Sequence, residues 1–149
     1  MLPHLLTILQ VEDTRSDAVL TAAALTAGEI PHVIHVVNDG KKAVAFLQHG
    51  AGYADSPRPD LILLDLGLPG LSGQEVLRFI KGDAILQTIP VVVFTTVDTD
   101  VSQQMAYKLH ANSYVVKPMD LSAFTHIIQS IAAYWSEISS MMPRRLQPV

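Results

Sequence analysis

The chain has 149 residues, of which 49% are hydrophobic and 16% charged, and its formal net charge is -4. This composition fits one compact globular domain and argues against a disordered chain. The absence of cysteine excludes disulfides, thiolate zinc sites, iron–sulfur clusters and a cysteine nucleophile. No basic run exceeds two residues, and we find neither a signal peptide nor an apolar run of the roughly 20 residues that a membrane span needs. We therefore expect a cytoplasmic protein that binds neither nucleic acid nor membrane.

Short apolar runs alternate along the chain with longer helical patterns. The predicted strands cover residues 5–11, 33–37, 61–64, 91–95 and 114–116. The predicted helices cover residues 16–27, 41–48 and 101–109, with two more beginning after Ser72 and Asp120. Such alternation requires crossover connections, which give a parallel sheet covered on both faces. The fold class is therefore α/β, a doubly wound five-stranded parallel sheet, in one domain spanning 1–149. Residues 134–149 are expected to form an extension of the last helix and a tail.

Charged and hydroxyl side chains follow four of the predicted strands. Because the carboxyl ends of parallel strands meet at one edge of a sheet, these side chains should converge there. They are Glu12-Asp13, Asp65, Thr95-Thr96 and Lys117-Pro118. Three carboxylates favour a hard divalent ion such as Mg²⁺, and a lysine and a hydroxyl can bind an anion beside it. These groups suit transfer of a phosphoryl group to Asp65.

Each of these features also has an ordinary structural explanation. A single acid at a strand end is usually a cap or a turn residue, an acidic pair can cap the next helix, and Lys-Pro can form a simple turn. The coincidence of all of them at successive strand ends favours a functional site.

The same blocks resemble the receiver domains of two-component response regulators, over residues 5 to about 135. The segment from Asp65 through Leu68-Pro69 to Leu71-Ser72-Gly73 is similar to the family's phosphoacceptor segment. The spacings agree as well, with 30 residues from Asp65 to Thr95 and 22 from Thr95 to Lys117. The resemblance implies a flavodoxin-like receiver fold.

The resemblance also assigns roles to individual residues. Asp65 would accept a phosphoryl group from a sensor histidine kinase or a histidine phosphotransfer protein. The implied Mg²⁺ ligands are Glu12, Asp13, Asp65 and the backbone carbonyl of Gly67. The implied phosphoryl contacts are Lys117, Thr95 and Thr96, with a cis peptide between Lys117 and Pro118. Thr95 and Tyr114 would form the switch, with Tyr114 turning inward as Thr95 moves. Apart from accepting the group and slowly losing it, no enzymatic activity is expected.

Two positions depart from the family pattern. Glu12 replaces a commoner aspartate, and Gly67 lacks the side chain usually found there. A rival interpretation is a Mg²⁺-dependent phosphohydrolase of the haloacid dehalogenase type, which carries a second acid two residues after its nucleophile. That position is Gly67 in this chain, which argues against such an enzyme. A nucleotide-binding flavodoxin-like module is a third possibility, but the chain contains no GxxxxGK[ST] or GxGxxG loop.

The last predicted helix carries an apolar stripe longer than a five-stranded sheet needs. Its members recur at alternating intervals of three and four residues and are Leu121, Phe124, Ile128, Ile131, Trp135 and Ile138. We expect a homodimer through this stripe, with the first half of the helix on the domain and the second half exposed. The alternative is that the stripe folds back as ordinary core, or that the end of the helix frays.

Only 32 residues follow Lys117, so the output is expected to be a protein contact or a phosphoryl relay. The 50–59 loop, the Phe94-Thr95-Thr96 block and the long last helix are most similar to regulators paired with phytochrome-type kinases. The six histidines are interpreted as structural or surface residues, and Asp98 and Asp100 as capping residues of the fourth helix.

Overall fold

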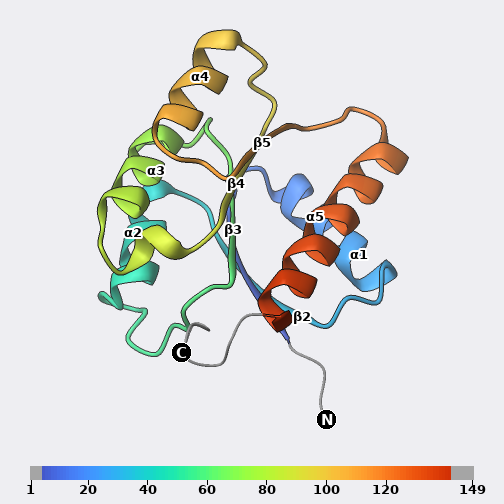
Figure 1. Ribbon diagram of the computed structural model, residues 1–149, viewed down its shortest axis with the longest axis horizontal. Helices are drawn as coiled ribbons and strands as arrows, with labels where there is room; N and C mark the ends of the chain where they lie inside the picture. The colour runs from blue at the N-terminus through green and yellow to red at the C-terminus, as the bar shows by residue number, and fades with distance from the viewer. Residues whose placement is uncertain (1–4, 142–149) are drawn as a thin grey trace.

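Five parallel strands form one sheet with helices on both faces in the computed structural model, which describes residues 5–141. The strand order is β2-β1-β3-β4-β5. Helices α2, α3 and α4 cover one face of the sheet and α1 and α5 cover the other (Figure 1). The strands are β1 (Leu6–Val11), β2 (His32–Val37), β3 (Leu61–Leu64), β4 (Val91–Thr95) and β5 (Ser113–Val116). The helices are α1 (Arg15–Ala27), α2 (Gly40–Gln48), α3 (Gly73–Gly82), η1 (Leu86–Thr88), α4 (Asp100–Lys108) and α5 (Leu121–Met141). The predicted α/β class and parallel sheet are confirmed.

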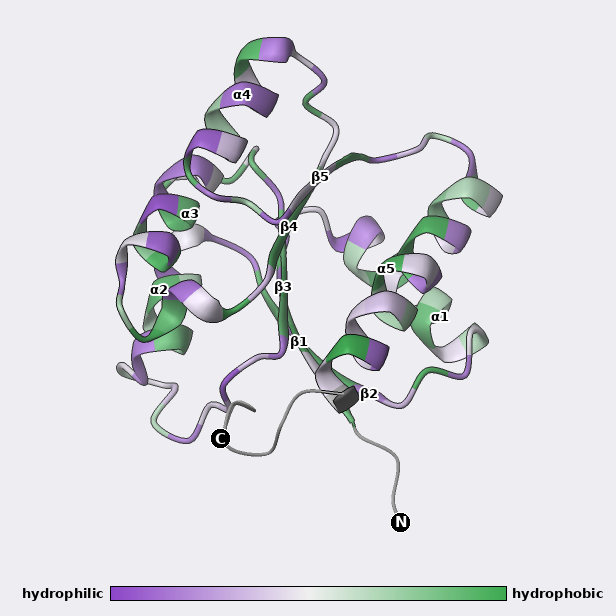
Figure 2. Ribbon diagram, in the orientation of Figure 1, coloured by the Kyte–Doolittle hydropathy of each residue, from purple (hydrophilic) through white to green (hydrophobic). Residues whose placement is uncertain are grey.

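The central strands are buried on both faces, which explains their continuous apolar sequences. Along β3, Ile62 and Leu64 enter the core under α2 and α3, whereas Leu61 and Leu63 enter the core under α1 and α5. Figure 2 shows these strands as green, hydrophobic ribbons between helices that alternate green and purple. Because successive side chains on a strand point to opposite faces, a strand with two covered faces cannot show a polar alternation.

Side-chain caps define where several helices begin. Ser72 and Glu75 form the predicted capping box of α3, with Ser72 Oγ accepting from the Glu75 N–H at 3.2 Å. Asp120 caps α5 by accepting from the Ala123 N–H at 2.9 Å. The cap of α4 differs from the prediction. Thr99 lies between Asp98 and Asp100 and is the residue whose side chain accepts from the Ser102 N–H, at 3.1 Å.

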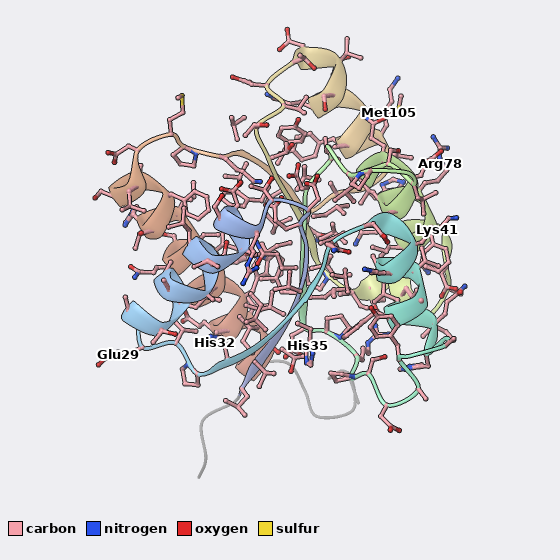
Figure 3. The ribbon with its side chains drawn as sticks, turned by 180° about the vertical axis from the view of Figure 1, so that it is seen from behind. Glu29, His32, His35, Lys41, Arg78 and Met105 are labelled. Carbon is pink, nitrogen blue, oxygen red and sulfur yellow. The ribbon has the colours of Figure 1, made fainter. Side chains whose placement is uncertain are left out.

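The two histidines of β2 lie on different sides of the sheet edge (Figure 3). His32 Nδ1 hydrogen-bonds with the carbonyl oxygen of Ile30 at 2.6 Å. The ring of His35 instead packs against Phe46 of α2, with 5.3 Å between ring centroids. Both side chains therefore have structural contacts, and they do not converge on one ligand site.

The apolar stripe of α5 is divided between the core and the surface. Phe124 and Ile128 are buried, and Phe124 meets Phe94 of β4 edge to face at 5.2 Å. Both side chains are covered by this chain's own sheet, so the prediction that they form a dimer interface is wrong. A three-and-four spacing suits packing on a sheet as well as packing on a partner helix, so it does not distinguish the two. Ile131 and Trp135 are partly buried against the same core.

The remaining predicted interface residues, Leu121 and Ile138, are exposed, as is Tyr134. Met142, which continues the spacing of the stripe in the sequence, lies outside the described residues. Although α5 has 21 residues, neither it nor another helix within 5–141 is long and apolar enough to cross a bilayer.

Candidate functional site

An acidic cluster lies at the carboxyl edge of the sheet, where sequence analysis placed it. Glu12 and Asp13 follow β1 and Asp65 follows β3. Glu12 and Asp65 are buried and Asp13 is exposed, and one carboxylate oxygen from each lies within 4.8 Å of the others. Three hard oxygen donors at this spacing, open to solvent on the Asp13 side, fit a divalent cation such as Mg²⁺.

Both oxygens of the Asp65 carboxylate accept hydrogen bonds, two of them from distant parts of the chain. The Thr95 hydroxyl donates to Oδ1 at 2.8 Å and the Gly67 N–H donates to the same atom at 3.1 Å. The Lys117 ammonium donates to Oδ2 at 3.0 Å. These bonds offset the cost of ending an apolar strand on a buried charge, and they fix the carboxylate in one orientation.

The turn after Asp65 depends on a glycine that sequence analysis noted only as part of a motif. A Cβ on Gly73 would lie 2.3 Å from the backbone oxygen of Asp65 and 2.5 Å from the Cα of Leu66. The start of α3 therefore packs directly on the backbone that carries Asp65, and only glycine leaves room for this approach.

Lys117 is a buried cation surrounded by three carboxylates. Its Nζ lies 2.5 Å from Glu12 Oε1, 2.8 Å from Asp17 Oδ2 and 3.0 Å from Asp65 Oδ2. Burial alone would lower the pKa of Lys117, but its hydrogen bonds to Asp17, Glu12 and Asp65 outweigh burial and raise it. The residue is therefore a permanent positive charge beside Asp65.

Asp17 is a member of this site that sequence analysis missed. It lies in the first turn of α1, four residues after Asp13. That spacing corresponds to about one helical turn and could have placed Asp17 near the cluster. Its contact with Lys117, 100 residues further along the chain, could not be read from spacing alone.

The pKa values of the two buried carboxylates move in opposite directions. Burial, followed by the neighbouring Asp65 carboxylate, raises the pKa of Glu12 from 4.5 to about 7. Burial also acts to raise the pKa of Asp65, but contacts from Glu12, the Gly67 N–H and Lys117 together lower it. Like-charged neighbours at close range separate their titrations in this way. Asp65 is thus ionised at neutral pH.

The two predicted switch residues are joined through the segment that follows β4. The Tyr114 hydroxyl donates to the Val97 carbonyl at 2.7 Å and lies 2.9 Å from Ser102 Oγ at the start of α4. The Val97 N–H in turn donates to Thr95 Oγ1 at 3.3 Å. Tyr114 is partly buried and packs against the core under α2 and α3. Thr96, predicted to contact a phosphoryl group, is exposed at the rim, and it is Thr95 that bonds Asp65.

The predicted cis peptide between Lys117 and Pro118 is not observed. No peptide bond among residues 5–141 is cis. The trans form is the lower-energy isomer of an X-Pro bond, and with it the Lys117 ammonium already reaches Asp65. The Lys117 N–H also donates to the Thr95 carbonyl at 2.7 Å.

Comparisons with known proteins agree with this geometry. The family described as "Response regulator receiver domain" matches residues 8–129. Response regulator Rcp1 of Synechocystis sp. is 42% identical over 130 residues, which are 87% of this chain and 88% of that protein. A crystal structure of the phosphorylated cyanobacterial phytochrome response regulator RcpA is 40% identical with a TM-score of 0.86, over 93% of this chain and 98% of that one.

A crystal structure of the Mn²⁺-bound form of Rcp1 is 42% identical, with a TM-score of 0.84, over 88% of this chain and 94% of that one. Nothing in these comparisons supports a haloacid dehalogenase. The family match spans the acidic cluster, β4 and Lys117. The chain therefore belongs to the receiver domains of response regulators and is related to the phytochrome response regulators.

Proposed function

We propose that Asp65 is the phosphoacceptor of this receiver domain and takes its phosphoryl group from a histidine kinase or a histidine phosphotransfer protein. The observation that carries the proposal is the Asp65 carboxylate itself. It is ionised, and it is held on both oxygens by Thr95, Gly67 and Lys117. A carboxylate fixed in this way beside a permanent cation is prepared for attack on phosphorus.

The proposed transfer forms one bond and breaks one bond. An oxygen of the Asp65 carboxylate attacks the phosphorus of a phosphohistidine, and the phosphorus–nitrogen bond breaks with its electron pair left on the imidazole. The product is an acyl phosphate on Asp65. The Lys117 ammonium and the Thr95 hydroxyl, which donate to Asp65 oxygens, are close enough to donate to the oxygens of the transferred group.

We propose Mg²⁺ as the resident cation, held by Glu12, Asp13 and Asp65, with the backbone carbonyl of Gly67 as a further ligand. When bound, the ion neutralises charge on the oxygens of the transferred group. The support is a set of three oxygen donors with no nitrogen or sulfur ligand among them. A Mn²⁺-bound form is named for the relative Rcp1, and Mn²⁺ and Mg²⁺ share this preference for oxygen.

The partner is proposed to be a phytochrome-type histidine kinase. The relative RcpA is described as a cyanobacterial phytochrome response regulator, and two further similar structures are bacteriophytochrome response regulators at 34% and 36% identity. A kinase of this kind takes its phosphoryl group from ATP, so we place the exchange in the cytoplasm. The output is proposed to be a protein contact made by α4, β5 and α5, which adjoin the switch residues.

Intact-mass measurement tests the phosphoacceptor directly. The protein is incubated with Mg²⁺ and either acetyl phosphate or a phosphorylated phytochrome-type kinase. We expect one phosphoryl adduct that is lost slowly and is absent from Asp65→Asn. Multiple turnover of small phosphoesters without an adduct would instead support a hydrolase. An adduct that persists in Asp65→Asn would refute the assignment of Asp65.

We also propose a homodimer through the exposed part of α5. Tyr134 and Ile138 are exposed on the second half of this helix, and Leu121 is 60% exposed at its start. Apolar side chains grouped on one helix favour an interface. Sedimentation at tens of micromolar should give a dimer, weakened by Ile138→Glu. A monomer both with and without phosphorylation would refute the proposal.

A further inference from the structure

The Lys117 ammonium uses all of its donors on carboxylates. A lysine ammonium carries three N–H groups. Glu12, Asp17 and Asp65 each accept one bond from Lys117, and the Lys117 side chain is only 4% exposed. The position of the amine is therefore set by these three acceptors and not by water.

These three acceptors have different roles in the proposed phosphoryl transfer. Glu12 and Asp65 belong to the acidic cluster that fits a divalent cation, and Asp65 is also the proposed attacking group. Asp17 belongs to neither, since it lies in the first turn of α1 and outside that cluster. Of the three contacts to Lys117, the one to Asp17 is thus free to persist while the other two carboxylates bind a cation or form a bond to phosphorus.

The backbone around Asp17 is tied to the centre of the sheet. The carbonyl of Asp17 accepts from the Thr21 hydroxyl at 2.9 Å. The same hydroxyl accepts from Gln10 Nε2 of β1 at 3.1 Å, and both Thr21 and Gln10 are buried. A hydrogen bond in a low-dielectric core is stronger than one in water and favours one arrangement of the two groups that share it. This contact gives the glutamine within the apolar sequence of β1 a partner, and it joins α1 to the strand that leads to Glu12.

We propose that Asp17 is a positioning residue that holds the Lys117 amine in place for the phosphoryl group before and after transfer. The inference rests on the proposed role of Asp65. Without the Asp17 carboxylate, the amine keeps only partners that the chemistry also uses. The amine would then shift whenever Glu12 or Asp65 moves, and it would no longer be fixed at the position from which it contacts the oxygens of the transferred phosphoryl group.

A double-mutant cycle tests this inference. The four proteins are the wild type, Asp17→Asn, Lys117→Gln and the double variant, and the rate is that of Asp65 phosphorylation by acetyl phosphate at saturating Mg²⁺. We expect Asp17→Asn to slow the wild type about fivefold to tenfold, the size of one charge-assisted hydrogen bond. It should have no further effect once Lys117 is glutamine, because residues that act through one contact are not additive.

The matched control is Asp100→Asn. Asp100 is also an acid in the first turn of a helix, so this variant loses the same charge at the same kind of position. It should leave the rate unchanged. If Asp17→Asn does not fold, Asp17→Glu retains the charge but displaces it by one methylene. Asp17→Glu should also slow the reaction.

A second measurement needs neither cation nor phosphoryl donor. With ¹⁵N-labelled lysine and EDTA, the Lys117 ammonium should give an NMR signal with slow proton exchange in the wild type and in Asp100→Asn. Exchange should be faster in Asp17→Asn. A wild-type rate and an unchanged ammonium signal in Asp17→Asn would overturn the inference, as would full additivity in the cycle. If the wild type accepts no phosphoryl group, the proposed function fails, and the ammonium signal still decides whether Asp17 positions Lys117.

Discussion

Replacing Glu12 by glutamine should stabilise the protein above neutral pH in the absence of Mg²⁺, and Mg²⁺ should remove most of this advantage. The substitution keeps the size of the side chain and removes its titration. Burial raises the pKa of Glu12 from 4.5 to about 7, so between these values the folded protein holds a proton that the unfolded chain has lost. The stability associated with this proton is fully present below pH 4.5 and is lost as the pH rises through about 7.

The size of the effect follows from the shift. One pKa unit corresponds to about 1.4 kcal/mol, so the complete loss is about 3 kcal/mol, and about 2 kcal/mol of it falls above about pH 5.5. Relative to Glu12→Gln, the wild type in EDTA should therefore lose about 2 kcal/mol of unfolding free energy between about pH 5.5 and about pH 8. Urea denaturation at several pH values measures this difference.

Added Mg²⁺ should remove most of the stability advantage that Glu12→Gln has in EDTA at about pH 8, because the gain and the loss are of similar size. An ionised Glu12 is a ligand, and a cation at about 100 times its dissociation constant adds about 3 kcal/mol to the folded state. Glu12→Gln should gain much less. Glu29→Gln, a change of an exposed acid, is the control and should follow the wild type throughout. Parallel pH profiles of the wild type and Glu12→Gln in EDTA would show that Glu12 carries no proton near neutrality and would refute the reasoning.

Three further predictions concern the scaffold around the site. Gly73→Ala should cost about 1–3 kcal/mol in urea denaturation because its Cβ would overlap backbone, whereas Gly82→Ala, with nothing within 4 Å, should cost much less. Equal losses would contradict this account. Tyr114→Phe loses the contact with Ser102 and should speed amide exchange at the start of α4, and unchanged exchange would contradict that role. Phe124→Ala should cost about 3–5 kcal/mol at any protein concentration, and a cost that depended on concentration would place Phe124 in an interface after all.

Much of the architecture follows from local sequence because the sheet is buried on both faces. The observed bounds of Leu61–Leu64 and Val91–Thr95 match the prediction, since each run is apolar and is followed by polar residues. The parallel order then brings residues 65, 95 and 117 to one edge without any knowledge of side-chain contacts. The resemblance to a known family adds their roles, which topology alone does not assign.

Other features depend on contacts that no local pattern contains. Three neighbouring residues, Asp98, Thr99 and Asp100, could each cap α4, and the choice of Thr99 depends on how the preceding loop leaves β4. The α5 stripe has the same spacing whether it packs on a sheet or on a second chain. Phe124 is therefore assigned only by its contact with Phe94.

The hydrogen bonds that begin at Asp65 explain how a change of charge there can reach α4. Asp65 Oδ1 accepts from the Thr95 hydroxyl, and Thr95 Oγ1 accepts from the Val97 N–H. The Val97 carbonyl accepts from Tyr114, whose hydroxyl also contacts Ser102 of α4. The proposed phosphoryl group on Asp65 would add nearly two negative charges and strong acceptors, so we expect the Thr95 hydroxyl to be drawn to it and to move the Val97 backbone with it. The Tyr114 hydroxyl must then follow that carbonyl or release it. Either response alters the contact with Ser102, which is how local electrostatics can change the surface of α4.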